Sequence, residues 1–413
     1  MSPLNILSDQ TGHLALKSNV HLLYAARCLR GFGDGFAVII LPAYLSALGF
    51  SPIEIGFVAT ASLFGTAVFT LLIGLIAPRH DLRNMLLLGA ALMAFTGIAF
   101  PSSEYLVLIA AVAFIGTINP STGDIGVLVP LEHALLARNV ADEERTRAFA
   151  RYSLTGALSM AAGSLAAGMP DVLVARGLDN VAAFRLMFYL YAALGLIAAV
   201  IYQQLPRSPA EPSRPVAPLG PSRHVVYKLA ALFSLDAFAG GFIVQSLLAL
   251  WLFEKFDLSL AAASVFFFWS GVLSAFSYPV AARIAGRIGL INTMVFTHIP
   301  SSVCLIAAAF SSNLTLALGL LLVRSALSQM DVPTRTSYVM AVVTPAERTA
   351  AASVTAVPRS LASSISPTFA GMLLTLPFAG LPLVFCGSLK IAYDIALLYS
   401  FRHIKPPEEK AVS

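Results

Sequence analysis

Charge is scarce in this sequence. Asp, Glu, Lys and Arg make up 11% of its 413 residues, whereas hydrophobic residues make up 58%. An average soluble protein has about 25% charged residues, so the composition excludes an ordinary soluble globule, and the high apolar content excludes a disordered chain. A large part of the protein surface must therefore face lipid.

Cysteine is rare as well, and its three residues, Cys28, Cys304 and Cys386, lie far apart in apolar segments. Their spacing fits neither a disulfide framework nor a zinc site, so we expect small buried side chains. Residues 1–19 lack the short apolar segment and the small-residue cleavage site of a signal peptide. The first apolar segment is therefore expected to remain as a membrane anchor.

The motifs of common enzyme classes are also missing. The sequence has no HExxH, no GxSxG, no paired metal-ligand motif and no phosphate-binding loop. We therefore expect no intramembrane enzyme, no ATP hydrolysis and no cofactor. The net charge of +5 is spread between apolar segments, whereas a nucleic-acid binder would gather it on one face, so nucleic acid is not an expected partner.

Long apolar segments are what the sequence has in abundance. A bilayer core of about 30 Å requires about 20 helical residues. Twelve segments qualify: 21–48, 52–77, 84–101, 104–128, 148–169, 184–204, 226–253, 259–282, 289–310, 313–332, 350–376 and 380–401. They are apolar on all sides, unlike the alternating strands of a membrane barrel. The predicted fold class is an all-α integral membrane protein with twelve transmembrane helices.

Basic residues give these helices an orientation. With the N-terminus in the cytoplasm, 18 of the 26 Lys and Arg residues fall in segments on the cytoplasmic side, Arg335 among them. Three fall outside and five lie within helices. Because cytoplasmic loops carry an excess of Lys and Arg, we expect both termini in the cytoplasm.

A proline-rich segment divides the chain. From Pro206 to Pro221, proline recurs at every third residue, which favours an extended spacer with little fixed packing; a ligand for a proline-recognition domain is the alternative. The predicted parts are a cytoplasmic segment (1–19), a six-helix half (20–204), a cytoplasmic linker (205–223), a second six-helix half (224–402) and a cytoplasmic tail (403–413).

The two halves repeat each other in sequence. Val-Pro at 129–130 recurs at 332–333, and Glu-Arg-Thr at 144–146 recurs at 347–349, both with an offset of 203. Further matches, at offsets of 204 to 206, are Arg79 with Arg283, Arg83 with Arg287, Gly65 with Gly271 and Phe50 with Phe256. A nearly constant offset indicates a duplication.

Two related six-helix halves joined by a cytoplasmic linker resemble the major facilitator superfamily over residues 20–402. The loop after the second helix is similar to the signature loop of that family: Gly74, Arg79 and Arg83 match, whereas Pro78 and Asp81 stand where the family has Asp and Gly. Residues 29–36, 116–124 and 328–343 resemble a bacterial branch of the superfamily without an assigned substrate.

The resemblance implies two six-helix bundles around a central cavity that the first, fourth, seventh and tenth helices line. It implies a monomeric secondary active transporter in the bacterial inner membrane, which moves a small polar, charged or amphipathic solute by alternating access with protons as the coupling ion. Export is favoured, because exporters are common in this superfamily. An uptake symporter and, more distantly, a sensor or channel without coupled transport stay open.

Ionisable residues within the predicted helices are the candidate site, because charge inside a membrane is costly and usually functional. Arg27, Arg30 and Asp34 share one face of the first helix. At about 1.5 Å per residue Asp34 lies about 20 Å deep, near mid-membrane. We expect Asp34 to bind a proton or substrate; a structural ion pair with Arg30 is the alternative. The glycines at 31, 33 and 35 are expected to allow close helix contact.

The other three helices that the resemblance assigns to the cavity contain ionisable residues too. The candidates there are Asn119 and Asp124 in the fourth helix, Asp236 in the seventh, and Arg324, Gln329 and Asp331 in the tenth, with Arg324 and Asp331 on one face. For the segment that contains Asn119 and Asp124, a structural kink near the cytoplasmic end is the alternative. Asp236 is the second choice for the coupling residue. Charge of both signs favours a polar or charged solute, or proton coupling, over a purely lipidic solute.

Five more ionisable residues in or near the predicted helices are weaker candidates for a functional role. Glu132 is expected at the membrane interface, and Arg359 in the eleventh helix is a candidate gate residue. Lys390 and Asp394 are four residues apart, which predicts a private ion pair. His298 could titrate near neutral pH, but a satisfied packing role is more common for a lone histidine.

Overall fold

The computed structural model describes residues 3–121, 126–207, 219–344 and 347–403, and its regular secondary structure in these ranges is helical. The helices are α1 (Pro3–Ala47), α2 (Pro52–Ile76), η1 (Ala77–Arg79), α3 (Leu82–Ala99), η2 (Phe100–Ser102), α4 (Leu106–Ile115), α5 (Val129–Asn139), α6 (Asp142–Ala166), α7 (Met169–Ala175), α8 (Asn180–Gln203), α9 (Arg223–Gly241), α10 (Gln245–Phe256), α11 (Leu260–Ile288), α12 (Leu290–Phe310), α13 (Leu314–Ser328), α14 (Asp331–Val342), α15 (Arg348–Leu374) and α16 (Leu381–Phe401).

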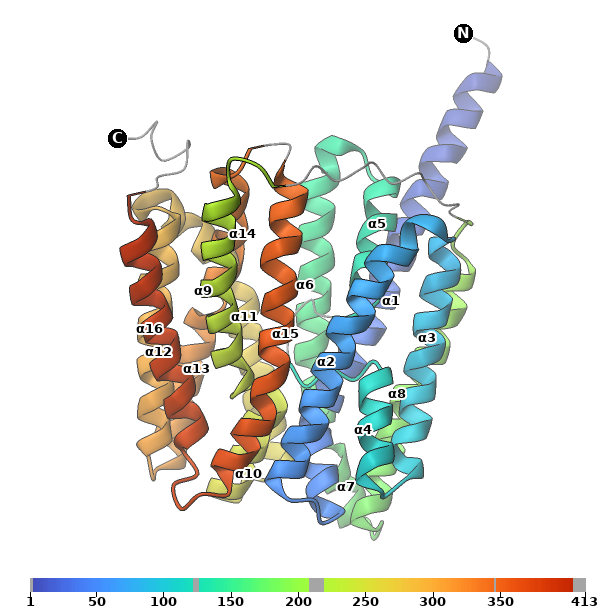
Figure 1. Cartoon of the computed structure of the whole chain (residues 1–413). Helices are drawn as coiled ribbons and strands as arrows, with labels where there is room; N and C mark the ends of the chain where they lie inside the picture. The colour runs from blue at the N-terminus through green and yellow to red at the C-terminus, as the bar shows by residue number, and fades with distance from the viewer. Residues whose placement is uncertain (1–2, 122–125, 208–218, 345–346, 404–413) are drawn as a thin grey trace.

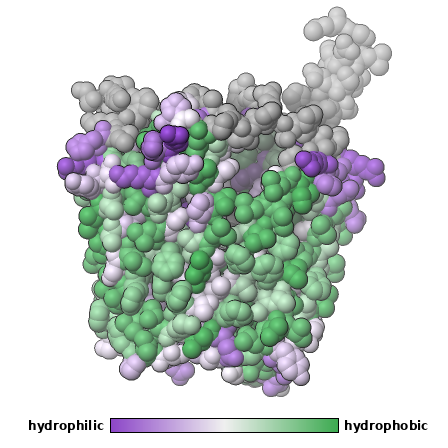
Figure 2. Space-filling model, in the orientation of Figure 1, coloured by the Kyte–Doolittle hydropathy of each residue, from purple (hydrophilic) through white to green (hydrophobic). Residues whose placement is uncertain are grey.

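The long helices stand side by side in one bundle, and α1 begins at the same end at which α16 ends (Figure 1). We call this the terminal end and the opposite one the distal end. Apolar side chains cover the middle of the visible face, and hydrophilic ones gather toward its two ends (Figure 2). This distribution suits a protein that spans a lipid bilayer.

Ten segments of the described residues are long and apolar enough to cross a membrane, and they match ten of the twelve predicted spans. The eleventh predicted span is α15, a continuous helix of 27 residues. The fourth is divided into α4 and α5. The chain is therefore a multi-pass membrane protein.

Side-chain caps begin several of these helices. Ser51 and Glu54 form a capping box at the start of α2, which satisfies backbone N–H groups that have no partner within the helix. Asp81 caps α3 by accepting hydrogen bonds from the backbone N–H groups of Arg83 (2.8 Å) and Asn84 (3.4 Å). The departure of Asp81 from the family's loop therefore has a structural role.

The fourth, seventh and tenth spans are broken inside the bundle. The prediction of one continuous helix over 104–128 is wrong, because α4 ends at Ile115 and α5 begins only at Val129. The seventh span breaks between α9 and α10, and the tenth between α13 and α14. Non-helical backbone at membrane depth requires protein partners. One such partner for the fourth span comes from the second half, because the N–H of Ser246 donates to the carbonyl of Pro120 at 3.1 Å.

Glycine brings α1 and α6 into close contact. A Cβ atom added at Gly31 or Gly35 would collide with the backbone of α6, at Gly156 and Met160 respectively. Glycine at such positions lets two helix backbones approach closely. The predicted packing role is thus confirmed at these two positions.

Three hydrophobic clusters show how the halves meet. One cluster at the distal end contains residues from both halves, among them Leu41, Phe188, Trp251 and Leu374. At the terminal end each half has its own cluster, which includes Leu86 and Leu135 in the first half and Met294 and Leu397 in the second. The halves therefore share a core at the distal end and pack separately at the terminal end.

Helices α2 and α15, one from each half, are in contact near the distal end and separate toward the terminal end. Near the distal end, the backbones touch at Gly56 and Gly371, and the hydroxyl of Thr368 donates to that of Thr60 at 2.8 Å. Toward the terminal end the two helices diverge (Figure 1), and a Cβ atom added at Gly74 would have no neighbour within 4 Å.

The described ends of the linker are packed, contrary to the expectation of little fixed packing. Leu205 is buried in the terminal cluster of the first half, and Leu219 packs against that of the second. The carboxylate of Glu347 accepts hydrogen bonds from the backbone N–H groups of Gly220 and Ser222 and from the Ser222 hydroxyl. The middle of the linker, 208–218, lies outside the described residues.

The first prediction concerns the distal contact. In a chain whose three cysteines are replaced by serine, Thr60→Cys with Thr368→Cys is expected to form a disulfide on mild oxidation, because the two hydroxyls lie 2.8 Å apart. After cleavage at a protease site placed within 208–218, the two halves should migrate together on a non-reducing gel. The pair Gly74→Cys with Ser353→Cys, at the terminal end of the same helices, is the control. Equally fast cross-linking of that pair would contradict the described divergence.

The second prediction concerns Glu347. Hydrogen bonds from the hydroxyls of Thr344 and Ser222, followed by backbone N–H groups, lower the pKa of Glu347 from 4.5 to about 2. A carboxylate whose pKa is lower in the folded than in the unfolded protein stabilises the fold at any pH above its unfolded-state pKa. This contribution is lost as the pH falls toward its folded-state pKa. Glu347→Gln should lower the melting temperature by the same amount from pH 7 to 5, and by less below about pH 4.5.

The control is Glu144→Gln, the matching residue of the first half, which is exposed and should leave the melting temperature unchanged. A difference between wild type and Glu347→Gln that grows on acidification would contradict the stated role of the carboxylate.

Candidate functional site

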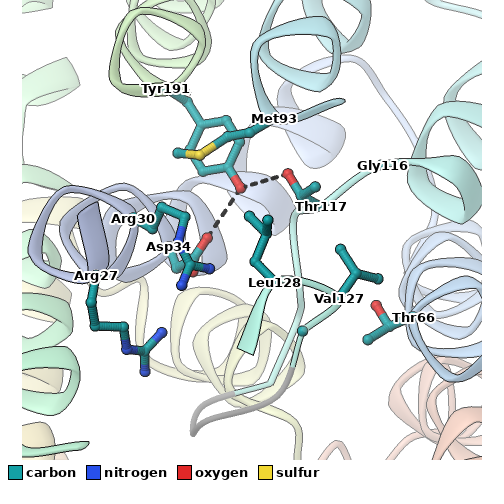
Figure 3. Close-up of a pocket in the computed structure, with 11 residues that line it drawn as sticks. Arg27, Arg30, Asp34, Thr66, Met93, Gly116, Thr117, Val127, Leu128 and Tyr191 are labelled. Carbon is teal, nitrogen blue, oxygen red and sulfur yellow. Dashed lines mark hydrogen bonds between the residues drawn. The ribbon is translucent and has the colours of Figure 1, made fainter. Parts of the chain in front are cut away.

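The candidates of the first helix line a small cavity between α1, α2, α3, α8 and the chain that joins α4 to α5 (Figure 3). The lining residues include Arg27, Arg30, Asp34, Thr66, Thr117 and Tyr191. Its volume of about 20 Å³ is enough for one water molecule. The break between α4 and α5 exposes backbone to this cavity, which a continuous helix would not do.

Asp34 has a phenol as its partner in this cavity. The hydroxyl of Tyr191 donates to Asp34 Oδ1 at 3.0 Å, and Thr117 Oγ1 lies 3.0 Å from the same hydroxyl. None of the described residues places a basic nitrogen within ion-pair distance of this carboxylate. The alternative of a structural Arg30–Asp34 ion pair is therefore wrong.

Arg30 instead pairs with Glu132, in the first turn of α5. The hydroxyls of Tyr152 and Tyr202 donate to the same carboxylate, which is fully buried. The prediction of Glu132 at the interface is wrong, because α5 begins inside the bundle and a carboxylate in the first helical turn is favoured by the helix dipole. Arg27 lies over the Tyr152 ring, with 5.2 Å between the guanidinium carbon and the ring centre.

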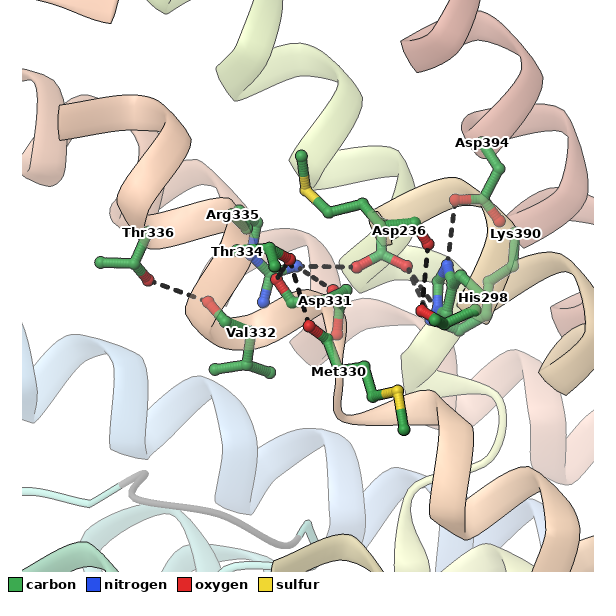
Figure 4. Close-up of polar contacts among 12 residues, drawn as sticks. Asp236, His298, Met330, Asp331, Val332, Thr334, Arg335, Thr336, Lys390 and Asp394 are labelled. Carbon is green, nitrogen blue, oxygen red and sulfur yellow. Dashed lines mark hydrogen bonds and ion pairs between the residues drawn. The ribbon is translucent and has the colours of Figure 1, made fainter. Parts of the chain in front are cut away.

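A buried charged network in the second half is centred on Asp236 (Figure 4). Asp236 Oδ2 accepts a hydrogen bond from Arg335 at 3.2 Å, and Oδ1 accepts one from Lys390 at 2.6 Å. Arg335 also pairs with Asp331, one turn away on α14, at 3.0 Å. The prediction of Arg335 in a cytoplasmic loop is wrong, because α14 continues the tenth span and only 6% of this residue is exposed.

A histidine connects two of these charges. Lys390 lies 3.2 Å from His298 Nε2, and Asp394 Oδ1 lies 3.1 Å from His298 Nδ1. Because an ammonium group can only donate, Nε2 accepts from Lys390 and Nδ1 carries the proton donated to Asp394. The prediction of a private Lys390–Asp394 pair is wrong, since each binds a partner on another helix. His298 is satisfied, as expected, but within a charged network.

The two buried ion pairs occupy equivalent places in the repeat. The offset of 206 relates Arg30 to Asp236, and the offset of 203 relates Glu132 to Arg335. Each pair joins the first and fourth helices of its half, and the two signs are exchanged between the halves. The offsets that indicate duplication are therefore the sequence signal that could have identified Glu132 and Arg335, which composition within single spans does not single out.

The remaining candidates lie apart from these networks. Asn119 is buried in the chain between α4 and α5, where its Oδ1 accepts from the N–H of Ser121 at 2.9 Å. Gln329 lies at the break before α14, so Arg324 on α13 and Asp331 on α14 do not share a helix face as predicted. Asp124 lies outside the described residues.

The signature-loop residues lie outside the candidate site. Gly74, Arg79 and Arg83 lie around the ends of α2 and α3 at the terminal end, away from the cavity. Within the part of the chain that the structure describes, no three His, Cys, Asp or Glu side chains are grouped to hold a metal ion.

Comparison with known proteins places this arrangement in context. A family model described as Major Facilitator Superfamily matches residues 23–367. Uncharacterized membrane protein YJR124C of Saccharomyces cerevisiae is 25% identical, over 93% of this chain and 94% of its own. Multidrug efflux protein YfmO of Bacillus subtilis is 24% identical, over 96% and 97%. The solved structure of the nucleoside transporter NupG superimposes with a TM-score of 0.71 at 14% identity, covering 93% of this chain and 99% of that one.

The third prediction separates the two carboxylates near Arg30. Glu132→Gln leaves Arg30 buried without a counter-charge, a change that usually costs about 3–5 kcal/mol, and should lower the melting temperature of the purified protein strongly. Asp34→Asn breaks no ion pair and should change it little. The double variant Arg30→Gln with Glu132→Gln should recover most of the loss. A larger loss in Asp34→Asn than in Glu132→Gln would show that the pairing is misassigned.

Proposed function

The chain belongs to the major facilitator superfamily, and from this membership we propose that it moves a small polar, charged or amphipathic solute by alternating access, coupled to protons. The observation that carries the proposal is the contrast between one shared hydrophobic core at the distal end and two separate cores at the terminal end. Two halves whose described residues form one core at one end and two separate cores at the other can rock against each other and expose the space between them to either side.

The excess of basic residues in the predicted cytoplasmic segments supports an orientation with the terminal end in the cytoplasm. In that orientation the shared core lies toward the outside and the two separate cores lie toward the cytoplasm, which supports a conformation closed toward the outside. A bacterial inner membrane is the proposed location, and the monomer the proposed unit of transport.

Asp34 is the proposed coupling residue. Four other carboxylates are buried along the membrane-spanning helices, and each contacts a basic side chain or histidine: Glu132, Asp236, Asp331 and Asp394. Protonation of any of these four would break a charged contact. Glu347 is buried too, but at the terminal end of α15, where hydroxyl and backbone N–H groups hold it. Among the described residues, Asp34 accepts a hydrogen bond from the Tyr191 hydroxyl and forms no ion pair, so it can gain or lose a proton without disrupting one, and it lines a cavity with room for water.

Asp236, the second choice from the sequence, is a weaker candidate. Lys390 and Arg335 each hold one of its oxygen atoms, and two cations strongly favour the ionised carboxylate. Its proposed role is to join α9, α14 and α16 within the second half.

Export is the proposed direction. It is supported by the multidrug efflux protein of Bacillus subtilis, which matches over nearly the full length of both chains. Uptake by a symporter of the same fold is the alternative. The direction of solute flux under an imposed pH gradient distinguishes export from uptake.

The fourth prediction tests proton coupling at Asp34. In proteoliposomes, with a solute identified by thermal-shift screening, Asp34→Asn is expected to abolish accumulation driven by a pH gradient and to leave solute exchange without a gradient within about threefold of wild type. The reason is that Asn retains size and hydrogen bonding but cannot titrate. Wild-type accumulation in this variant would exclude Asp34 as the coupling residue.

A matched control is Asp257→Asn, in the distal loop after α10. Asp257 is exposed and has a left-handed backbone with φ of 49°, a conformation that Asn also adopts readily. It should retain both pH-driven accumulation and exchange.

A further inference from the structure

Arg359, on α15, is a cation for which the described residues supply no partner. Its Nε atom is buried without a hydrogen-bond acceptor among them, and none of the described carboxylates lies within ion-pair distance of its guanidinium group. A guanidinium group cannot lose its proton in a protein, so Arg359 cannot become neutral to reduce the cost of burial. It requires an anion or water as its partner.

The acceptors in the vicinity of Arg359 are already occupied. Arg359 interacts electrostatically with Arg335, which repels it, and with Asp236 and Asp331, which attract it. Asp236 gives one oxygen to Lys390 and the other to Arg335, and Asp331 pairs with Arg335 as well. Arg359 therefore adds positive charge beside a network whose carboxylates already have cations.

Arg359 is half-buried on α15, next to a face of that helix that points toward the first half. Large apolar side chains such as Ile365 and Met372 are exposed on one face of α15, which is the face suited to lipid. On roughly the opposite face, near Arg359, the small residues Ala356 and Ser360 are exposed. The same face touches α2 nearer the distal end, at Gly371, so it is exposed here because α2 diverges.

We propose that Arg359, with Arg335 beside it, binds the anionic group of the transported solute, a carboxylate or a phosphate, as the solute enters between α2 and α15 from the terminal end. This inference rests on the proposed transport function and names its substrate class. The planar guanidinium fork matches a carboxylate or phosphate through two parallel hydrogen bonds, and binding would give Arg359 the counter-charge that the described residues do not supply there.

The test measures binding without any gradient. The melting temperature of the purified full-length protein is followed at constant ionic strength with sodium succinate, sodium benzoate or sodium phosphate, against sodium chloride and the neutral analogues succinamide and benzamide. We expect at least one of the three anions to raise the melting temperature by several degrees and the neutral analogues to have no effect. Carboxylates that act where phosphate does not, or the reverse, identify the group.

Two variants assign the effect to Arg359. Arg359→Gln should abolish the shift, and Arg359→Lys, which keeps the charge but loses the fork, should weaken apparent affinity about tenfold or more. The control Arg176→Gln removes an exposed arginine from the distal loop after α7 and should retain the full shift. If Arg359→Gln does not fold, wild type and Arg359→Lys still decide the question.

The inference is overturned if none of the three anions stabilises the wild-type protein more than chloride does, or if the shift survives unchanged in Arg359→Gln or Arg359→Lys. The proposed proton coupling can fail separately. Wild-type flux in Asp34→Asn would reject Asp34 as the coupling residue without affecting a binding measurement at Arg359.

Discussion

Charge buried inside a membrane-spanning bundle must be compensated, and in this protein the compensation comes from ion pairs between helices that are far apart in the sequence. Arg30 pairs with Glu132, and Asp236 pairs with Arg335 and Lys390. Each half is thereby fastened through its first and fourth helices at equivalent places of the repeat. A partner removed from such a pair leaves a buried charge, so these contacts constrain how helices can be arranged within each half.

The exchange of signs between the two halves leaves a different charge outside the ion pairs in each half. In the first half, Glu132 satisfies Arg30 and leaves Asp34 with a phenol as its partner. In the second half, Asp236 is held by two cations, and the basic residue Arg359 has a buried Nε atom to which the described residues give no partner. A carboxylate outside the ion pairs in the first half suits the proposed proton site, and such a cation in the second half suits the proposed anion site.

Broken helices make this arrangement possible. The interruption between α4 and α5 starts a new helix inside the bundle, which places Glu132 in a first turn beside Arg30. The interruption between α13 and α14 does the same for Asp331 and Arg335. The fourth and seventh spans also bond to each other at their breaks, through Ser246 and Pro120, so the irregular segments join the halves as well as shaping the cavity.

The sequence by itself determined the class of protein and the number of spans, because membrane thickness and the cost of buried charge act on local composition. It also identified Arg30, Asp34 and Asp236 as unusual, since a charge in an apolar segment is visible without any contact. The partners were decided by the tertiary structure alone: Glu132 is 102 residues from Arg30, and Lys390 is 154 residues from Asp236. The tertiary structure also decided that the two halves share a core at the distal end. Which helices of the two halves touch depends on the packing of both bundles, and no single segment of the sequence encodes that packing.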